Sequence, residues 1–191
     1  DAILKTLLPD GIILSLPFST CELEKLILKR LKKNNKFKFI GYEWDSETFW
    51  NLCKTIAQEK LNISAMQGSI GDAIMKGNEN EFAHLILDYC GVLDTFANEI
   101  EHAIKKNLVK VGGTISVTLS KIGIQNDAGV IGDIFRTMPK ELFGGEIKET
   151  ELGVKLFFNN IMNKNYKVEK FFNYQDKGKM AMMLIIVRRI A

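Results

Sequence analysis

The amino-acid sequence predicts an α/β fold: a three-layer, doubly wound sheet that is mostly parallel, has about seven strands and ends in a C-terminal antiparallel hairpin. Short apolar runs alternate with longer amphipathic segments between residues 11 and 119. Two strand-like segments, 166–174 and 179–188, are joined by a short turn with Gly178 where a hairpin needs glycine. The 191 residues, 46% hydrophobic and 26% charged, have the balance of one globular domain, so residues 1–191 are assigned to a single domain.

Two strands and two helices alternate at the start of the chain. Residues 11–16 are predicted as a buried strand because the run is apolar, rich in branched side chains and followed by proline. The helix predicted over 22–33 has its apolar residues on one face, and Ser19 is a candidate N-cap in a capping box. A strand over 37–42 and a helix over 46–61 repeat the pattern. Strands separated by such helices favour right-handed crossovers and a parallel sheet.

The next strands continue the parallel part of the sheet. A weaker strand is predicted over 63–67, and the clearest buried strand covers 83–87. A long helix over 96–109 is followed by the pair Gly112-Gly113, which is typical of the residues just after a helix. The fifth strand is predicted over 114–119.

The alternation stops after residue 120. The segment 121–153 contains six glycines and Pro139, and it is predicted to hold one short helix over 130–138. No other helix is assigned before the C-terminal hairpin. The sheet is therefore expected to finish with an antiparallel pair.

The loops after the parallel strands are the expected location of a binding site, because ligands of open α/β sheets bind at the carboxyl ends of the strands. A loop of small residues before a helix offers backbone N–H groups to an anion, and hydroxyl groups can add to them. The candidate binding residues in the four loops are Leu16, Pro17, Phe18, Ser19 and Thr20 in the first, Glu43, Trp44 and Asp45 in the second, Ser69, Ile70 and Asp72 in the third, and Asp88 and Tyr89 in the fourth.

Three of these loops suit a molecule with an adenosine and a charged tail. An acid at the end of the second strand can accept hydrogen bonds from both ribose hydroxyls, and the adjacent Trp44 can stack on a base. An acid after the third strand can accept a hydrogen bond from an adenine amino group.

In this order of elements the chain resembles the class I S-adenosylmethionine-dependent methyltransferases. The resemblance rests on Glu43, the turn 68–72, the strand ending LILDYCG, the helix leading to VGGTISVTLS and the terminal hairpin. It implies that S-adenosyl-L-methionine is the cofactor and lies over the first four strand ends. It also implies that Glu43 or Asp45 contacts the ribose, Asp72 the adenine, and Asp88 the region between cofactor and acceptor.

The first loop departs from the family pattern. It reads LSLPFSTCELEK, and no glycine lies between Leu14 and Ile40. Glycine lets a backbone approach a ligand closely, so Pro17, Ser19 and Thr20 must do this with larger side chains. The missing glycines also argue against a nicotinamide dinucleotide, whose pyrophosphate needs the Gly-x-Gly-x-x-Gly turn.

The leading functional hypothesis is methyl transfer to an unidentified acceptor. Asp88 and Tyr89 are the candidate catalytic residues, since Asp88 can orient or deprotonate an acceptor and Tyr89 can stack against a planar one. The alternative is a methyltransferase-like protein that has lost turnover and serves as a binding or assembly subunit, an idea motivated by the first loop.

A nucleic acid is one candidate acceptor. The net charge of +3 indicates no general affinity for nucleic acid. A local cationic group near the terminal hairpin could still flank a nucleic-acid path. Its members are Lys164, Lys167, Lys170, Lys177 and Lys179.

Other chemistry is disfavoured by the residues present. Cys21, Cys53 and Cys90 are too few and too scattered for a disulfide framework or a zinc site, which favours a reducing, cytoplasmic location. Cys90 is more typical of a small core side chain than of a nucleophile. His84 and His102 have no ligand-like spacing, so no metal is expected.

No membrane span is expected, because the longest apolar run, 180–187, is well below the roughly 18 residues that a membrane helix needs. The chain begins with Asp1 rather than methionine, so an N-terminal segment could be missing. The sequence leaves the oligomeric state open.

Overall fold

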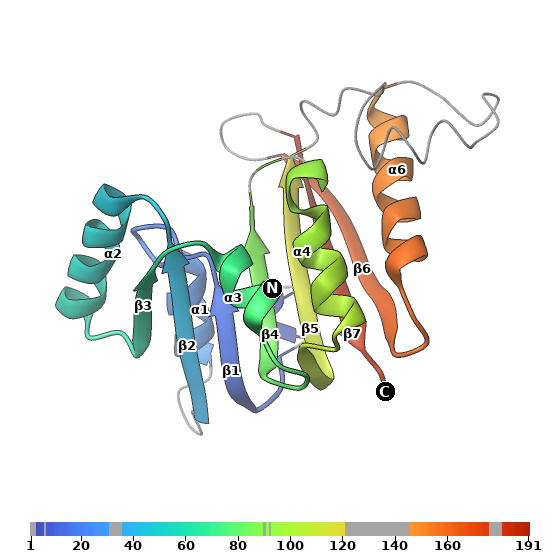
Figure 1. Ribbon diagram of the computed structural model, residues 1–191. Helices are drawn as coiled ribbons and strands as arrows, with labels where there is room; N and C mark the ends of the chain where they lie inside the picture. The colour runs from blue at the N-terminus through green and yellow to red at the C-terminus, as the bar shows by residue number, and fades with distance from the viewer. Residues whose placement is uncertain are drawn as a thin grey trace.

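The computed structural model describes residues 3–5, 7–30, 36–89, 91, 93–120, 146–175 and 181–191. Its seven strands form one sheet in the order β3-β2-β1-β4-β5-β7-β6 (Figure 1). The strands are β1 (Asp10–Ser15), β2 (Lys36–Glu43), β3 (Ile63–Gln67), β4 (Phe82–Asp88), β5 (Val109–Ser120), β6 (Tyr166–Gln175) and β7 (Ala181–Arg189). The helices are η1 (Ile3–Lys5), α1 (Glu22–Arg30), α2 (Ser46–Glu59), α3 (Ile70–Lys76), α4 (Leu93–Lys105) and α6 (Glu146–Ile161).

The predicted fold class is confirmed. Strands β1 to β5 pair in parallel, whereas β7 is antiparallel to both β5 and β6. The order reverses between β1 and β4, which lie side by side with Ser15 opposite Ile86. The connections from these two strands leave toward opposite faces of the sheet, so a crevice is expected at their carboxyl ends.

Two hydrophobic clusters hold helices on the two faces of the sheet. Leu85 and Leu87 of β4 belong to the cluster that contains α4 and α6, with Ile100 and Phe158 fully or almost fully buried. Ile86, between them in sequence, belongs to the cluster on the opposite face. Strand β4 is apolar without interruption because both of its faces are covered.

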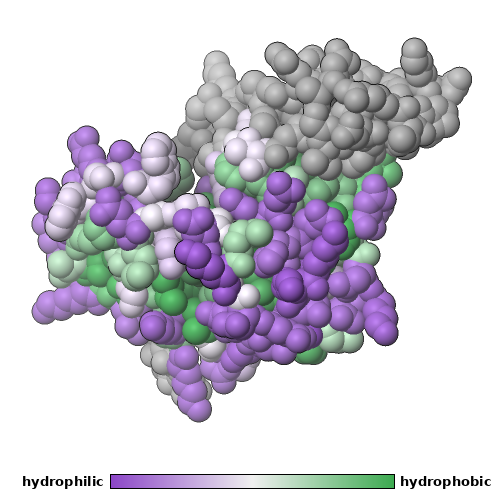
Figure 2. All heavy atoms as spheres, viewed as in Figure 1, coloured by the Kyte–Doolittle hydropathy of each residue, from purple (hydrophilic) through white to green (hydrophobic). Residues whose placement is uncertain are grey.

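The second cluster joins α1 and α2 to the sheet, through Ile27 and Leu52 packed with Ile13 and Phe39. In Figure 1, α4 crosses in front of the sheet and α1 lies behind it. Figure 2 shows hydrophilic side chains gathered over the outer side of α4, as expected for a helix that buries only one face. No helix of the described residues is long and apolar enough to cross a membrane.

The predicted boundary between α4 and β5 is wrong. Helix α4 ends at Lys105, and Asn107 follows in the left-handed conformation with φ of 53°. The pair Gly112-Gly113 lies inside β5, where the pairing with β4 shifts register. A Cβ at Gly113 would overlap the carbonyl of Ala83, so the glycine permits a close approach of the two strands rather than ending a helix.

Two α-helices have no counterpart in the sequence prediction. Helix α3 begins within the segment 69–72 that was expected to be a loop, and α6 begins within the segment 121–153, for which a helix was expected only over 130–138. Gly153 is buried beside Val154, which shows that packing of the helix outweighs the low helix propensity of glycine. The helix predicted over 130–138 lies outside the described residues.

Candidate functional site

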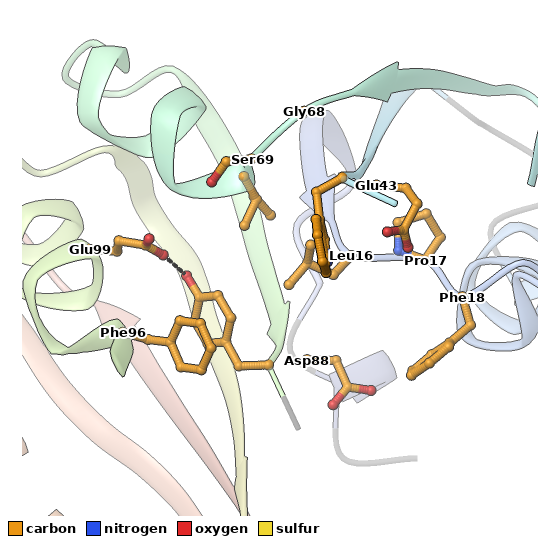
Figure 3. Close-up of a pocket in the computed structure, with 12 residues that line it drawn as sticks. Leu16, Pro17, Phe18, Glu43, Gly68, Ser69, Asp88, Phe96 and Glu99 are labelled. Carbon is orange, nitrogen blue, oxygen red and sulfur yellow. Dashed lines mark hydrogen bonds between the residues drawn. The ribbon is translucent and has the colours of Figure 1, made fainter. Parts of the chain in front are cut away.

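A cavity of about 470 Å³ opens at the carboxyl ends of β1 to β4. Its volume is typical of small-molecule sites, which span roughly 300–1,000 Å³. Figure 3 shows Phe96 and Glu99 on one side of it, Pro17 and Glu43 on the other, and Asp88 between Phe96 and Phe18. The cavity is lined by Leu16, Pro17, Phe18, Glu43, Trp44, Gly68, Ser69, Ile70, Asp88, Tyr89, Phe96 and Glu99.

Most of the sequence-predicted residues come together here, from all four loops. Four do not line the cavity: Ser19, Thr20, Asp45 and Asp72. Three lining residues were missed by the sequence prediction, namely Gly68, Phe96 and Glu99. Phe96 and Glu99 are three residues apart on the helix after β4, a spacing that places both on one helical face and was visible in the sequence.

The two acids after β2 have different roles. The carboxylate of Asp45 accepts a hydrogen bond from the backbone N–H of Thr48 over 2.8 Å and is the N-cap of α2. That hydrogen bond lowers the pKa of Asp45. Glu43 instead lines the cavity, and its carboxylate accepts a hydrogen bond from the backbone N–H of Asp45 over 2.9 Å.

Asp72 and Ser19, which were also predicted to bind a ligand, do not line the cavity. Asp72 is exposed in the first turn of α3. Ser19 is not the N-cap of α1, which corrects the predicted capping box. The backbone carbonyl of Cys21 accepts the first helical hydrogen bond, from the N–H of Lys25, so the helix begins two residues later than a cap at Ser19 requires.

A glycine on a neighbouring strand brings the first loop close to the sheet. Pro17 packs so tightly against Gly41 of β2 that a Cβ there would lie 2.5 Å from Pro17 Cγ. The first loop itself contains no glycine, and the glycine that permits its close contact with the sheet lies on β2. The ring of Phe18 is 60% exposed and lines the cavity mouth.

The second loop contributes a large aromatic surface. Trp44 lines the cavity although its side chain is 78% exposed. The backbone N–H of Gly68 donates to the carbonyl of Glu43 over 3.0 Å, so the second and third loops are held together at the cavity edge. An exposed indole beside a carboxylate can stack on a planar ligand while the acid accepts its hydroxyls.

Tyr89 is fixed by α4. Its ring stacks on Phe96 with centroids 3.7 Å apart, and its hydroxyl donates to Glu99 Oε2 over 2.5 Å (dashed line in Figure 3). Burial, followed by the interaction with Glu99, raises the pKa of Tyr89. The hydroxyl therefore stays protonated at neutral pH and acts as a hydrogen-bond donor to Glu99.

Among the described residues, the charged side chains that line the cavity are all acidic. They are Glu43, Asp88 and Glu99, and no lysine, arginine or histidine of the described residues joins them. Acceptor oxygens of this kind suit a ligand that presents hydrogen-bond donors or a positive charge. No group of three or more histidine, cysteine or acidic residues in the described part of the chain is arranged to hold a metal ion, and Cys90 lies outside it.

The predicted cationic group does not gather at this cavity. Lys167 of β6 lies opposite Arg188 of β7, and Arg188 lies opposite Thr114 of β5. Thr114 in turn lies opposite His84, near the start of β4. This is the end of the parallel strands opposite the cavity. Lys164 precedes the same end of β6. Lys170 pairs with Ile186 near the middle of the strand, and Lys177 and Lys179 lie outside the described residues.

No family model and no curated protein matches this sequence. Solved structures do match its fold. A SAM-dependent methyltransferase from Methanosarcina mazei is 12% identical with a TM-score of 0.62, over 99% of this chain and 97% of that chain. An O-methyltransferase from Bacillus cereus, in complex with SAH, is 11% identical with a TM-score of 0.62, over 98% of this chain and 77% of that chain.

A tRNA methyltransferase from B. subtilis is a third match, 10% identical with a TM-score of 0.58 over 98% of this chain. This chain spans only 64% of that structure, and 60% of a further match from Pyrococcus horikoshii. The described residues therefore have the fold of class I S-adenosylmethionine-dependent methyltransferases.

Proposed function

We propose that this protein is an S-adenosylmethionine-dependent methyltransferase whose cofactor and acceptor meet in the cavity at the carboxyl ends of β1 to β4. The observation that carries the proposal is the position of this cavity. It lies where the strand order reverses between β1 and β4, and residues of all four loops line it. The fold that it shares with solved methyltransferases supports the same assignment.

The residues present fit the cofactor. Glu43 offers carboxylate oxygens to the ribose hydroxyls, and the exposed indole of Trp44 offers a face to the adenine. The carboxyl groups of Glu43, Asp88 and Glu99 in the lining are compatible with the positive charge of a sulfonium. When bound, the cofactor supplies an electrophilic methyl group, so the protein needs mainly to position an acceptor and remove its proton.

Asp88 is the proposed group for that task, since it ends β4 and its carboxyl group lines the cavity. Tyr89 provides a fixed aromatic surface rather than a base, because its hydroxyl is committed to Glu99. A planar acceptor can lie against this surface with a hydrogen-bond donor directed at Asp88.

The first loop favours a second candidate, a binding or assembly subunit without turnover. Pro17 has no backbone N–H to donate to a ligand, and the phenyl ring of Phe18 lines the cavity. Both features reduce the anion-binding capacity that glycine-rich loops supply.

Calorimetric titration separates these functions. S-adenosylmethionine and S-adenosylhomocysteine should bind, whereas ATP and NAD should not. Glu43→Ala should weaken S-adenosylhomocysteine binding about tenfold or more, the effect of losing hydrogen bonds to a charged group of about 1.5–3 kcal/mol. Glu47→Ala removes an exposed acid from the first turn of α2 and is the matched control. Failure of both sulfur ligands to bind at millimolar concentration would overturn the proposal.

Transfer of a labelled methyl group to RNA, DNA, protein and small-molecule pools identifies the acceptor. We propose nucleic acid as the first pool, because a tRNA methyltransferase shares this fold. Once an acceptor is found, Asp88→Asn should reduce turnover strongly without abolishing cofactor binding. Binding of the cofactor with no transfer to any pool would favour the subunit without turnover.

A further inference from the structure

The acid expected to face the cavity from the third loop does not do so, and an acid of a helix lies there instead. Asp72 is exposed and does not line the cavity, whereas Glu99 of α4 does line it. Figure 3 shows Glu99 on the side of the cavity away from Glu43. The cavity therefore has a carboxyl group on each of these two sides, and the one far from Glu43 does not come from a strand-end loop.

The carboxylate of Glu99 lies directly against the start of α3. A Cβ at Gly71 would overlap this carboxylate and would lie 3.2 Å from Ser69 Oγ. Gly71 is buried, and its backbone N–H donates to Ser69 Oγ over 3.1 Å. Because Gly71 has no side chain, Glu99 can occupy the space beside the third loop, next to Ser69 and Ile70, which also line the cavity.

The fourth loop fixes the orientation of this carboxylate. Glu99 Oε2 accepts the hydrogen bond from the Tyr89 hydroxyl over 2.5 Å, and the Tyr89 ring is stacked on Phe96 of the same helix. An ionised carboxylate accepts hydrogen bonds at both of its oxygens. With Tyr89 at Oε2, Glu99 keeps acceptor capacity at Oε1, the oxygen on the side of Gly71 and the third loop. Glu99 is thus an oriented acceptor at the wall of the cavity.

The ligand that would meet this acceptor follows from the proposed function, on which the inference rests. Glu43 offers oxygens to the ribose hydroxyls, and Trp44 offers a face to the adenine. In adenosine, the 6-amino group is on the edge of the base that points away from the ribose. A base that extends across the cavity from Glu43 presents this hydrogen-bond donor at the opposite side, where Glu99 lies.

We propose that Glu99 of α4 recognises the adenine base of the cofactor, by accepting a hydrogen bond from its 6-amino group at Oε1. Glu99 determines specificity for the base and takes no part in methyl transfer. A purine with a carbonyl oxygen at position 6 brings two acceptors together, and a purine without a substituent there leaves the carboxylate without this donor. Both are therefore disfavoured, because a site built for a hydrogen-bonding group rejects an analogue that lacks it.

Paired calorimetric titrations measure the contribution of the amino group. The ligands are S-adenosylhomocysteine and its analogue with hydrogen in place of the 6-amino group. The unmodified protein should bind S-adenosylhomocysteine about tenfold or more tightly than the analogue, as expected for a hydrogen bond to a charged acceptor. Glu99→Ala should reduce this preference to about twofold or less, since the acceptor is gone. Glu99→Gln should reduce it in part, because an amide oxygen accepts a hydrogen bond but carries no charge.

Two further variants are controls. Glu101→Gln changes an acid two residues further along α4, which pairs with Lys105 over 2.5 Å, and should keep the preference. Asp72→Asn should keep it too, because Asp72 does not line the cavity. A purely structural effect of replacing Glu99 would weaken the binding of both ligands equally and leave their ratio unchanged.

The outcomes separate this proposal from the methyltransferase assignment. If S-adenosylhomocysteine binds without preference over the analogue, or if Asp72→Asn removes the preference, the role of Glu99 is wrong and the methyltransferase assignment stands. An unchanged ratio in both Glu99 variants also overturns the role of Glu99. Should Glu99→Ala not fold, an unchanged ratio in Glu99→Gln alone has the same meaning. If neither ligand binds, the methyltransferase assignment fails, and this inference fails with it.

Discussion

The hydroxyl of Tyr89 donates a hydrogen bond to the carboxylate of Glu99 over 2.5 Å, joining the end of β4 to the middle of α4 at the cavity. Glu99 also abuts Gly71 of α3, where any Cβ would overlap its carboxylate. One acid thus contacts elements on two sides of the cavity. The geometry of the fourth loop depends on this contact as well as on β4 itself.

Tyr89→Phe tests the contribution of this hydrogen bond. The variant keeps the ring and its stacking on Phe96 but leaves the Glu99 carboxylate without its donor. We expect the free energy of unfolding to fall by about 1.5–3 kcal/mol, the value typical of hydrogen bonds to charged groups. Urea denaturation measures it. Thr95→Ala, at an exposed position of α4, should change stability little. An unchanged midpoint for Tyr89→Phe would show that the contact contributes no stability.

Gly41→Ala tests the packing of the first loop. The added methyl group would overlap Pro17 Cγ, so the loop must move away from β2. We expect weaker binding of S-adenosylhomocysteine and a loss of about 1–3 kcal/mol in the free energy of unfolding, as for overpacked sites. Lys38→Ala removes an exposed side chain from the same strand and is the control. Affinity equal to that of the unmodified protein would show that the loop adjusts without affecting the cavity.

His84 makes stability depend on pH. It is fully buried; Nε2 accepts a hydrogen bond from the N–H of Leu8 over 2.7 Å, and Nδ1 lies 2.9 Å from Thr114 Oγ1. Because the Leu8 N–H can only donate, Nδ1 carries the ring proton. Burial, followed by the charge of Arg188, lowers the pKa of His84 to about 3 from an ordinary value of 6.5.

The unfolded chain therefore binds a proton at His84 below pH 6.5 that the folded protein does not bind above pH 3. The contribution of this pKa difference to the free energy of unfolding is fully present above pH 6.5. As the pH is lowered from 6 to 4, the free energy of unfolding should fall by up to about 1.4 kcal/mol per pH unit. Urea denaturation across this range measures the slope. His84→Asn should be less stable at pH 7 and have a shallower slope; equal slopes would contradict the assignment of this titration to His84.

Arg189 joins the C-terminal strand to the loops at the opposite end of the sheet. Its guanidinium is almost fully buried and donates to Asn80 Oδ1 and to the carbonyls of Asn107 and Val109, at 2.8 to 2.9 Å. Lysine retains the charge but not the planar set of donors. Arg189→Lys should lower the free energy of unfolding by about 3 kcal/mol or more, since several charge-assisted hydrogen bonds are lost.

Thermal denaturation with Arg188→Lys as the matched control checks this. Arg188 is half-buried and pairs with Glu169 over 2.7 Å, so its replacement should lower the melting temperature less. A larger loss for the Arg188 variant would reverse the expected importance of the two residues.

The sequence by itself determined the parallel sheet and the place of the site. Strand β4 is recognisable because its apolar run is covered on both faces, and Asp88 follows it directly. Parallel strands end at the same edge, so residues such as Glu43 and Asp88 could be assigned to one cavity from local pattern alone. The antiparallel hairpin followed from the short separation between its two strands.

Only the tertiary structure decided which side chains face the cavity. Whether Glu43 or Asp45 lines it depends on which acid caps α2, and Asp45 does so. Gly41 is distant in sequence from Pro17, and Glu99 is distant from Gly71, so no local pattern reveals these two contacts. In the sequence, Glu24 is one more charge on an amphipathic helix, and only the rotation of α1 against the sheet shows that it is buried. The direction of β6 likewise places Lys167 at the end of the sheet opposite the cavity, because the end at which a strand begins depends on whether the strand runs parallel or antiparallel to its neighbours, and the pairing in the tertiary structure decides this.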